Sequence, residues 1–454
     1  MPSRARPFIA PAYLLACLIL GGSAQGIWQN MILQLTGVGI IAWAAMAKRD
    51  EPLSLRARQL LWLGAAAILV VGVQMIPLPP SVWTHLRGRT VIAEGFGALG
   101  VAAPPEPISL SPATGLNSLL GIIPPLAIFC AMVRLRAYSP RWLAAALITG
   151  MVAGIALGAL QVAAANPTDS PLYLYEDTNP GKAVGFFANV DHMASLLVIT
   201  IPFLAALAAA GKSRNMQRFS AVVAIAAGIG VLVVVGLALN GSLAGYGLAL
   251  PVIVASGLIV LPAGNRQRLW VVVIAALLMI GSVAALEATA IGSNKIGTHA
   301  TNSVQSRKEI AATTARAVKD FMPLGSGLGS FRGVYSLYEQ PEQVTNEYVI
   351  HAHNDYLELA LELGVAGIIL IVLFLAWWAA AVWRAWRSAE AGPFARAAAI
   401  ASAAVLIHSI VDFPLRTAAI ATCFGMCAAL LADSRAAAPR EKAQLRRKRH
   451  VEFK

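Results

Sequence analysis

Charge is scarce in this 454-residue chain, in which only 13% of the residues are charged and 58% are hydrophobic. A soluble globular protein carries about 25% charged residues, so the composition excludes a soluble enzyme. It also excludes a disordered chain, because disordered chains are poor in apolar residues. Cysteine is rare as well, and no disulfide framework or thiolate zinc site is indicated. The cysteines lie inside apolar runs as small packing residues: Cys17, Cys130, Cys423 and Cys427.

Apolar runs of about 20 residues, the length that crosses about 30 Å of hydrocarbon, dominate what is present. They predict an all-α, polytopic integral membrane protein that forms a single membrane domain over residues 1–454. Arg4 and Arg6 ahead of the first run are compatible with a cleaved signal peptide, but the many runs that follow favour an uncleaved span. About twelve spans are expected, at roughly residues 8–24, 28–47, 60–77, 114–133, 142–164, 188–210, 219–239, 243–262, 268–286, 355–379, 396–412 and 415–433.

The distribution of positive charge predicts the orientation of these spans. An even number of spans places both termini on one side, and most of the 35 Lys and Arg residues fall on that side. By the positive-inside rule, both termini are expected in the cytoplasm. Membrane topology therefore explains the net charge of +13, and no nucleic acid partner is expected. The basic tail at Arg446–Arg449 fits an anchor near anionic membrane lipids.

Three long segments, 78–113, 165–187 and 287–354, are expected on the opposite, outer side, with the largest of them ahead of the tenth span. Long connections tend to carry function, so the outer face is predicted to be the functional one. Most of the histidines lie at or near it: His85, His192, His299, His351, His353 and His408.

The densest group of polar residues runs from His351 into the tenth span. Asp355, Glu358 and Glu362 are spaced i, i+3 and i+7, so they share one face of a helix that Asn354 or Asp355 can cap. A carboxylate at membrane depth costs at least a few kcal/mol, so this face is expected to look into a polar cavity. The alternative is the acidic outer end of an ordinary span.

His353 lies just before this helix, where an imidazole can accept the proton of an attacking hydroxyl. His351 and His353 alone are too few ligands to indicate a metal site. Gly364 and Gly367 predict close helix packing. Upstream, Gly325, Gly327 and Gly329 lack the context of a nucleotide-binding loop and predict a tight turn.

Ser306 and Glu309 have the spacing of a helix capping box, so an amphipathic helix is expected to begin near Ser306. A stripe of helical period follows. It consists of Ile310, Thr314, Val318 and Phe321. Arg307 would then lie in the first turn, where a guanidinium and free backbone N–H groups together suit a phosphate or diphosphate. A solvated charge pair on a surface helix is the open alternative.

Two further polar groups stand at the ends of predicted spans. The first group leads into the sixth span and consists of Lys182, Asn189, Asp191 and His192. Polar residues are common at this position, so by themselves they mean little. His408 and Asp412 are spaced i and i+4 near the end of the eleventh span, ahead of Pro414 and Arg416. They either line the same cavity or form a satisfied pair at a helix end.

The pattern His353-Asn354, nine residues, Gly364, two residues, Gly367 resembles the signature of the O-antigen ligase and O-antigen polymerase superfamily of bacterial envelope glycosyltransferases. The resemblance extends over about residues 182–416, and we expect a family-related core at 182–433 that includes the loop 287–354. It also rests on three other stretches: Lys182-x-x-Gly185-x-Phe187-x-Asn189, Gly327-Leu-Gly-Ser-Phe331 and His408-Ser-Ile-Val-Asp412-Phe-Pro-Leu415.

The resemblance implies a metal-independent glycosyltransferase without a cofactor, acting on the periplasmic side of the bacterial inner membrane. The donor would be an undecaprenyl diphosphate-linked oligosaccharide and the acceptor a glycan or lipid A-core. His353 would activate the acceptor hydroxyl and Arg307 would hold the diphosphate. The other residues expected to bind substrate are Lys182, Asn189, Asn354, Glu358, Asp412 and Arg416.

Two positions depart from the family pattern. Many members carry an arginine beside Ser242, where this chain has Leu243, and Lys182 is the nearest candidate to replace that cation. Val190 stands where the family often has Arg or Pro.

The segment Val411–Pro414 resembles surface-polysaccharide polymerases more than ligases, so we expect a polymerase, with a chain-length regulator as a possible partner. Ligation of O-antigen to lipid A-core is the first alternative. A lipid-linked glycan transporter is the alternative of another class, but it would concentrate polar residues near the middle of the membrane.

Overall fold

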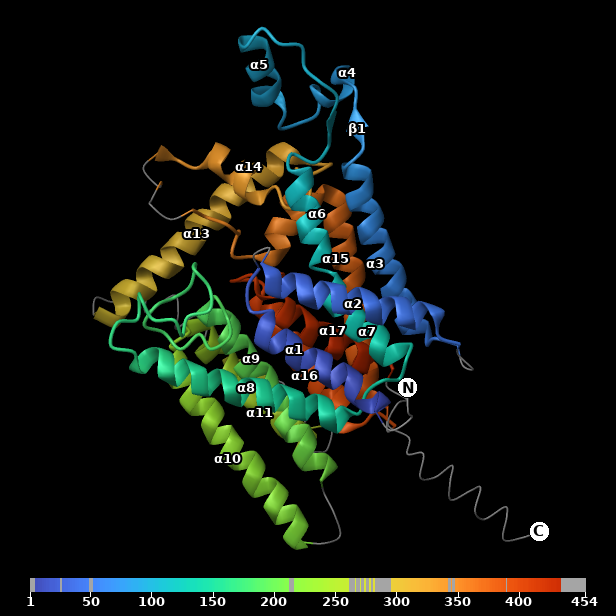
Figure 1. Ribbon diagram of the computed structural model, residues 1–454, viewed down its shortest axis with the longest axis vertical. Coiled ribbons are helices and arrows are strands. Elements are labelled where there is room, and N and C mark those ends of the chain that lie inside the picture. The colour runs from blue at the N-terminus through green and yellow to red at the C-terminus, as the bar shows by residue number, and fades with distance from the viewer. Residues whose placement is uncertain are drawn as a thin grey trace, which may run out of the picture.

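The computed structural model describes residues 5–24, 27–48, 52–211, 216–260, 295–341, 348–388 and 390–433, with a few isolated positions between these ranges. Within them the chain is almost entirely helical, which confirms the all-α class (Figure 1). The described residues include one short antiparallel ladder, in which β1 (Pro77–Leu78) pairs with β2 (Glu106–Pro107).

Most of the predicted spans correspond to apolar helices. Among the residues that the structure describes, seven helical segments are long and apolar enough to cross a membrane, and shorter apolar helices accompany them. The chain is therefore a polytopic membrane protein. The predicted span at 268–286 lies outside the described residues except for a few isolated helical positions. The apolar helices are α1 (Ile9–Leu20), α2 (Trp28–Met46), α3 (Leu55–Gln74), α6 (Pro112–Leu120), α7 (Ile123–Val133), α8 (Pro140–Ala163), α9 (Val190–Ala210), α10 (Met216–Asn240), α11 (Leu243–Val260), α15 (Asp355–Arg387), α16 (Pro393–His408) and α17 (Ala418–Ala432).

Two spans differ from the single helices that were predicted. The span expected at 114–133 is divided into α6 and α7, because Pro124 and Pro125 have no N–H to donate to the preceding turn. The eleventh span ends at His408, so Asp412 lies in the turn that follows α16 and not within the helix. Pro414, which begins the short helix η3 (Pro414–Arg416), disfavours a helical conformation at the residue before it.

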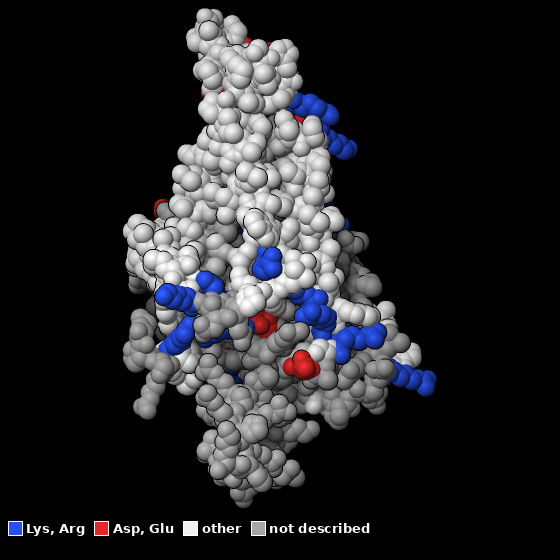
Figure 2. All heavy atoms as spheres, turned by 90° about the vertical axis from the view of Figure 1, so that its right-hand side faces the viewer, with Lys and Arg blue, Asp and Glu red and all other residues white. Residues whose placement is uncertain are grey.

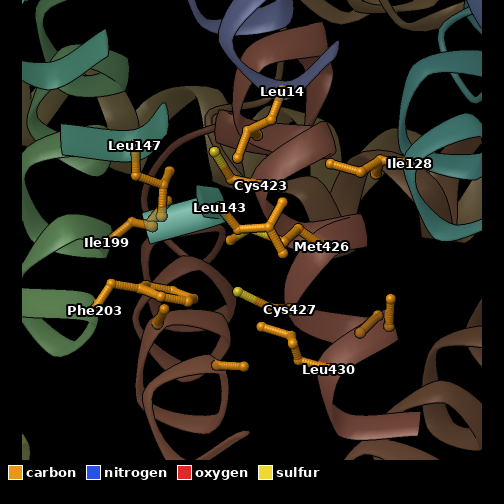
Figure 3. Close-up of a cluster of buried hydrophobic side chains, with 14 of the residues drawn as sticks. Leu14, Ile128, Leu143, Leu147, Ile199, Phe203, Cys423, Met426, Cys427 and Leu430 are labelled. Carbon is orange, nitrogen blue, oxygen red and sulfur yellow. The ribbon is translucent and has the colours of Figure 1, made fainter. Parts of the chain in front are cut away.

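The core lies where α1, α8, α9 and α17 meet (Figure 3). Cys423 and Cys427 of α17 are buried there between Leu14 of α1 and Phe203 of α9. Both thiols are unpaired, as is that of Cys17. These cysteines act as small packing residues, as the sequence predicts, and small side chains let membrane helices approach closely.

The long segments that were expected outside the membrane gather toward one end of the helix bundle. Residues 75–111 project from it and carry α4 (Pro80–Trp83) and α5 (Thr90–Ala98) (Figure 1). Trp83 is buried inside this projection and donates to the Pro104 carbonyl at 2.8 Å. Toward the same end, α13 (Lys295–Phe321) and α14 (Phe331–Tyr338) pack against α15.

Candidate active site

His353 lies immediately before α15 in a left-handed backbone conformation, with φ of +49°. Asn354 caps the helix, as predicted: its side chain accepts the Leu357 N–H and donates to the Ile410 carbonyl, both at 2.9 Å. His353 Nδ1 lies 3.1 Å from Asp412 Oδ1, and 26% of the histidine side chain is exposed. Because a carboxylate is the partner of Nδ1, that nitrogen carries the proton and Nε2 keeps its lone pair.

Asp412 has no exposed surface and lies among three histidines. Its Oδ1 faces His353, whereas His192 Nε2 and His408 Nε2 lie 3.6 and 3.9 Å from its Oδ2. Burial opposes ionisation of Asp412, but the hydrogen bond with His353 and the nearby positive charge of Arg307 hold its pKa below the usual value. The carboxylate is therefore suited to fix the orientation of the His353 ring.

Arg307 occupies the middle of α13, and the prediction that it lies in the first turn of a helix is wrong. The helix begins at Lys295, well before Ser306, so the helix N-terminus adds no positive charge at Arg307. A serine and a glutamate three residues apart also occur inside a helix, which is why the spacing misplaced the start. The apolar stripe is confirmed, since Ile310, Thr314 and Phe321 are buried.

The Arg307 guanidinium is anchored to the first turn of α9. Its Nη2 donates to Asp191 Oδ2 at 2.6 Å, while the Ser242 hydroxyl donates to the other Asp191 oxygen at 2.5 Å. Asn189 caps the helix by accepting the Asp191 N–H at 2.8 Å. Burial opposes the positive charge of Arg307, but Asp191 and Asp412 raise its pKa. Since 25% of the side chain is exposed, guanidinium donors remain for a ligand.

The first turn of α9 thus connects His353 to Arg307. Asp191 holds Arg307, and the next residue, His192, approaches the carboxylate that holds His353. These five residues, Asp191, His192, Arg307, His353 and Asp412, form the His353–Arg307 cluster. Sequence reasoning gave no weight to Asp191 and His192, because polar residues at the outer end of a span are common, and it used Ser242 only to mark the position beside Leu243.

A second cluster surrounds Arg416 on η3. The predicted shared face of Asp355, Glu358 and Glu362 is confirmed, but it packs against the Arg416 guanidinium instead of looking into an open cavity. Arg416 Nε lies 3.6 Å from Asp355 Oδ1, and its Nη2 lies 3.2 Å from Glu358 Oε1 and 3.4 Å from Glu362 Oε2. Burial disfavours the charged guanidinium, yet the three carboxylates raise the pKa of Arg416. This Arg416 cluster joins the start of α15 to the turn before α17.

His351 and two backbone amides complete the Arg416 cluster. His351 Nδ1 lies 2.9 Å from Glu358 Oε1, and the Ala352 N–H donates to the other oxygen of Glu358. The Gly329 N–H donates to Glu362 Oε1 at 2.8 Å. Every carboxylate of the shared face therefore has partners, which explains how it is tolerated at the end of a span.

The glycine-rich turn, which was predicted as a tight turn, packs backbone to backbone against α15. The close packing expected at Gly364 is made with this turn and not with another helix. α15 is kinked at Gly364, where φ is +61°. A Cβ on Gly364 would lie 2.1 Å from the Pro323 carbonyl oxygen. The Ser326 and Gly327 N–H groups donate to the Leu361 and Glu362 carbonyls, which the kink leaves free. The turn and the kink therefore depend on each other and hold the Arg416 cluster in place.

Lys182 is exposed beside the turn between α10 and α11. Its Nζ lies 3.6 Å from the position a Cβ on Gly241 would take, next to Ser242. The Lys182 loop is held by Gln161 of α8, a residue that sequence reasoning missed. The buried Gln161 amide accepts the Val184 and Gly185 N–H groups at 3.1 and 2.8 Å. A single glutamine within an otherwise apolar span was the available signal.

Comparison with known proteins identifies one part of the chain. Residues 228–372 match the family model described as O-antigen ligase. This stretch includes Arg307, His353 and the glycine-rich turn, whereas Lys182 and Asp412 lie outside it. No curated protein matches the chain in sequence. The chain is therefore a multi-pass membrane protein that carries, at residues 228–372, a domain matching the O-antigen ligase family model.

Proposed function

We propose that the protein transfers a glycan from a lipid diphosphate carrier to a sugar hydroxyl on the outer side of the bacterial inner membrane. The observation that supports this most is the joining of His353 and Arg307 through the first turn of α9. Such a transfer requires a general base and a cation that binds the diphosphate, and it requires both at the same site. The family match favours lipid-linked glycan substrates.

In the proposed reaction, the acceptor oxygen attacks the anomeric carbon of the donor sugar while the bond from that carbon to the diphosphate oxygen breaks. His353 Nε2 takes the hydroxyl proton, and the electron pair of the broken bond leaves with the lipid diphosphate. Asp412 accepts from Nδ1 at 3.1 Å, so it keeps the ring oriented and stabilises the imidazolium that forms.

Arg307 stabilises the negative charge that develops on the leaving diphosphate. Its bond to Asp191 fixes the guanidinium plane, so the remaining N–H groups can form the paired hydrogen bonds that suit phosphate oxygens. Lys182 is the candidate for a second cation, because its ammonium lies beside Gly241 at the turn where related proteins carry arginine. With a diphosphate as leaving group, charge stabilisation by these side chains suffices, and the proposed reaction is independent of metal and cofactor.

The other residues expected to bind substrate take supporting roles in this proposal. Asn189 caps α9, the helix that carries Asp191. Asn354 caps α15, the helix that follows His353. Glu358 and Arg416 are engaged with each other at 3.2 Å and have little exposed surface. Asp412 is fully buried. These residues therefore position His353 and Arg307, while Lys182 is left to contact substrate.

We propose a surface-polysaccharide polymerase, on the resemblance of Val411–Pro414 to such enzymes. Ligation of O-antigen to lipid A-core is the second candidate, favoured by the description of the matched family.

One experiment separates the two activities. The purified protein is incubated with an undecaprenyl diphosphate-linked repeat unit, alone or with lipid A-core, and the products are measured by length and by attachment. A polymerase lengthens the lipid-linked glycan without lipid A-core. A ligase forms product only when lipid A-core is present. Absence of product in both incubations would contradict the proposed transfer.

A further inference from the structure

A groove at the far end of α15 from His353 has no part in the proposed reaction. It has a volume of about 820 Å³ and lies between α3, α15 and the end of α17. The proposed active site precedes the first residue of α15, whereas the groove is lined by residues near the last turns of that helix. It therefore lies on the opposite side of the membrane domain. Its lining includes Arg56, Trp62, Leu373, Trp377, Arg384 and Asp433.

Two arginines from different helices line this groove. Among the residues that the structure describes, neither Arg56 nor Arg384 forms an ion pair, and Arg56 Nη1 is buried without a hydrogen-bond partner. Asp433, the acidic residue of the lining, is engaged by Arg136. A buried guanidinium donor without a partner is unfavourable, and so are two like charges at one site. An anion between the two arginines would remove both costs.

Apart from Ser54 and Gln59, the rest of the lining is apolar, and part of it faces outward from the bundle. Trp62 is 72% exposed and Leu373 is 50% exposed, so both present apolar surface that an acyl chain would cover. Figure 2 faces the side of the bundle where α3 lies, and it shows most of the visible Lys and Arg in a band below mid-height, with a few Asp or Glu among them. The surface above the band is largely uncharged apart from one basic group near the top. Such a band is typical of a helix bundle at the level of lipid headgroups.

We propose that this groove binds an anionic glycerophospholipid of the leaflet opposite the His353–Arg307 cluster. Its phosphate lies between Arg56 and Arg384, and an acyl chain lies along Trp62 and Leu373. Basic pockets between membrane helices recognise anionic headgroups in this way. The apolar wall favours a lipid over a free phosphate ion, because a free ion would leave the wall uncovered.

Binding is tested without reference to catalysis. The detergent-purified protein is titrated with phosphatidylglycerol, phosphatidylcholine or inorganic phosphate, and native mass spectrometry counts the bound molecules. The variant is Arg56→Gln with Arg384→Gln. The matched control is Arg58→Gln with Arg387→Gln, which removes the same charge from the same two helices but not from the groove lining.

We expect the parent protein and the control to retain one phosphatidylglycerol and the groove variant to bind it at least fivefold more weakly. Equal binding by the groove variant, or equal loss in the control, would overturn the proposal. Inorganic phosphate that competes fully with phosphatidylglycerol would show a simple anion site and overturn the lipid assignment. If the double variant is not monodisperse, the exposed Arg384→Gln alone is measured against Arg387→Gln by the same criteria.

Discussion

At the scale of the single residue, the hydrogen bond between Arg307 and Asp191 shows which interactions a lysine at position 307 could keep. Arg307→Lys keeps the charge and can keep one bond to Asp191, but it loses the planar donors that would face the diphosphate. We expect kcat/KM to fall by roughly 10²-fold. The control is Arg316→Lys on the same helix, where the exposed arginine donates to Thr313. Near-normal activity of Arg307→Lys would contradict the hypothesis that Arg307 forms paired hydrogen bonds to phosphate oxygens.

Asp412 is expected to act mainly through His353, although its charge also supports that of Arg307. Asp412→Asn keeps the size of the side chain but removes the carboxylate that accepts from Nδ1, so the ring loses the tautomer that leaves Nε2 free. We expect kcat to fall by roughly 10³-fold with little change in the KM for the donor. Steady-state kinetics at saturating acceptor measures both constants. A large rise in KM with unchanged kcat would instead indicate that Asp412 serves donor binding.

At the scale of the element, the kink of α15 depends on a glycine. Gly364→Ala would place a Cβ at a positive φ and 2.1 Å from the Pro323 carbonyl oxygen, so the glycine-rich turn must move away. We expect a loss of about 1–3 kcal/mol in stability, seen as a lower midpoint of thermal unfolding in detergent. Gly72→Ala in α3 is the control, because no atom lies within 4 Å of its added Cβ. An unchanged midpoint for Gly364→Ala would contradict the role of the kink.

The helices and the turn that follow from local sequence patterns could be predicted from the sequence. Contacts between side chains that are far apart in the chain could not. Runs of apolar residues predicted the helices of the core, and the glycine spacing predicted the turn that meets Gly364. The position of Arg307 within α13 was missed, because capping residues also occur inside helices. Its partner Asp191 and the partners of Arg416 lie far away in the chain. No local period carries information about such pairs.

At the scale of the whole molecule, the charge distribution predicts which end of the bundle faces outward. Leu99, in the projection that carries α5, is expected outside, and Glu390, between α15 and α16, is expected in the cytoplasm. A membrane-impermeant maleimide should therefore label Leu99→Cys in right-side-out vesicles and Glu390→Cys in inside-out vesicles. The parent protein provides the background: Cys17, Cys423 and Cys427 are buried, and Cys130, which is partly buried, lies in the apolar helix α7. The reverse pattern would place the His353–Arg307 cluster on the cytoplasmic side and contradict the proposed transfer.

The central claim is that His353 performs the proton transfer in a site that needs no metal. The most direct measurement compares the parent protein with His353→Ala in single-turnover transfer, with a chelator present and the Kd for the lipid diphosphate-linked donor determined separately. We predict that the chelator leaves the parent rate unchanged, and that His353→Ala lowers the rate by roughly 10³-fold while the donor Kd changes little. A variant that turns over at nearly the parent rate, or a parent protein that the chelator inactivates, would contradict the claim.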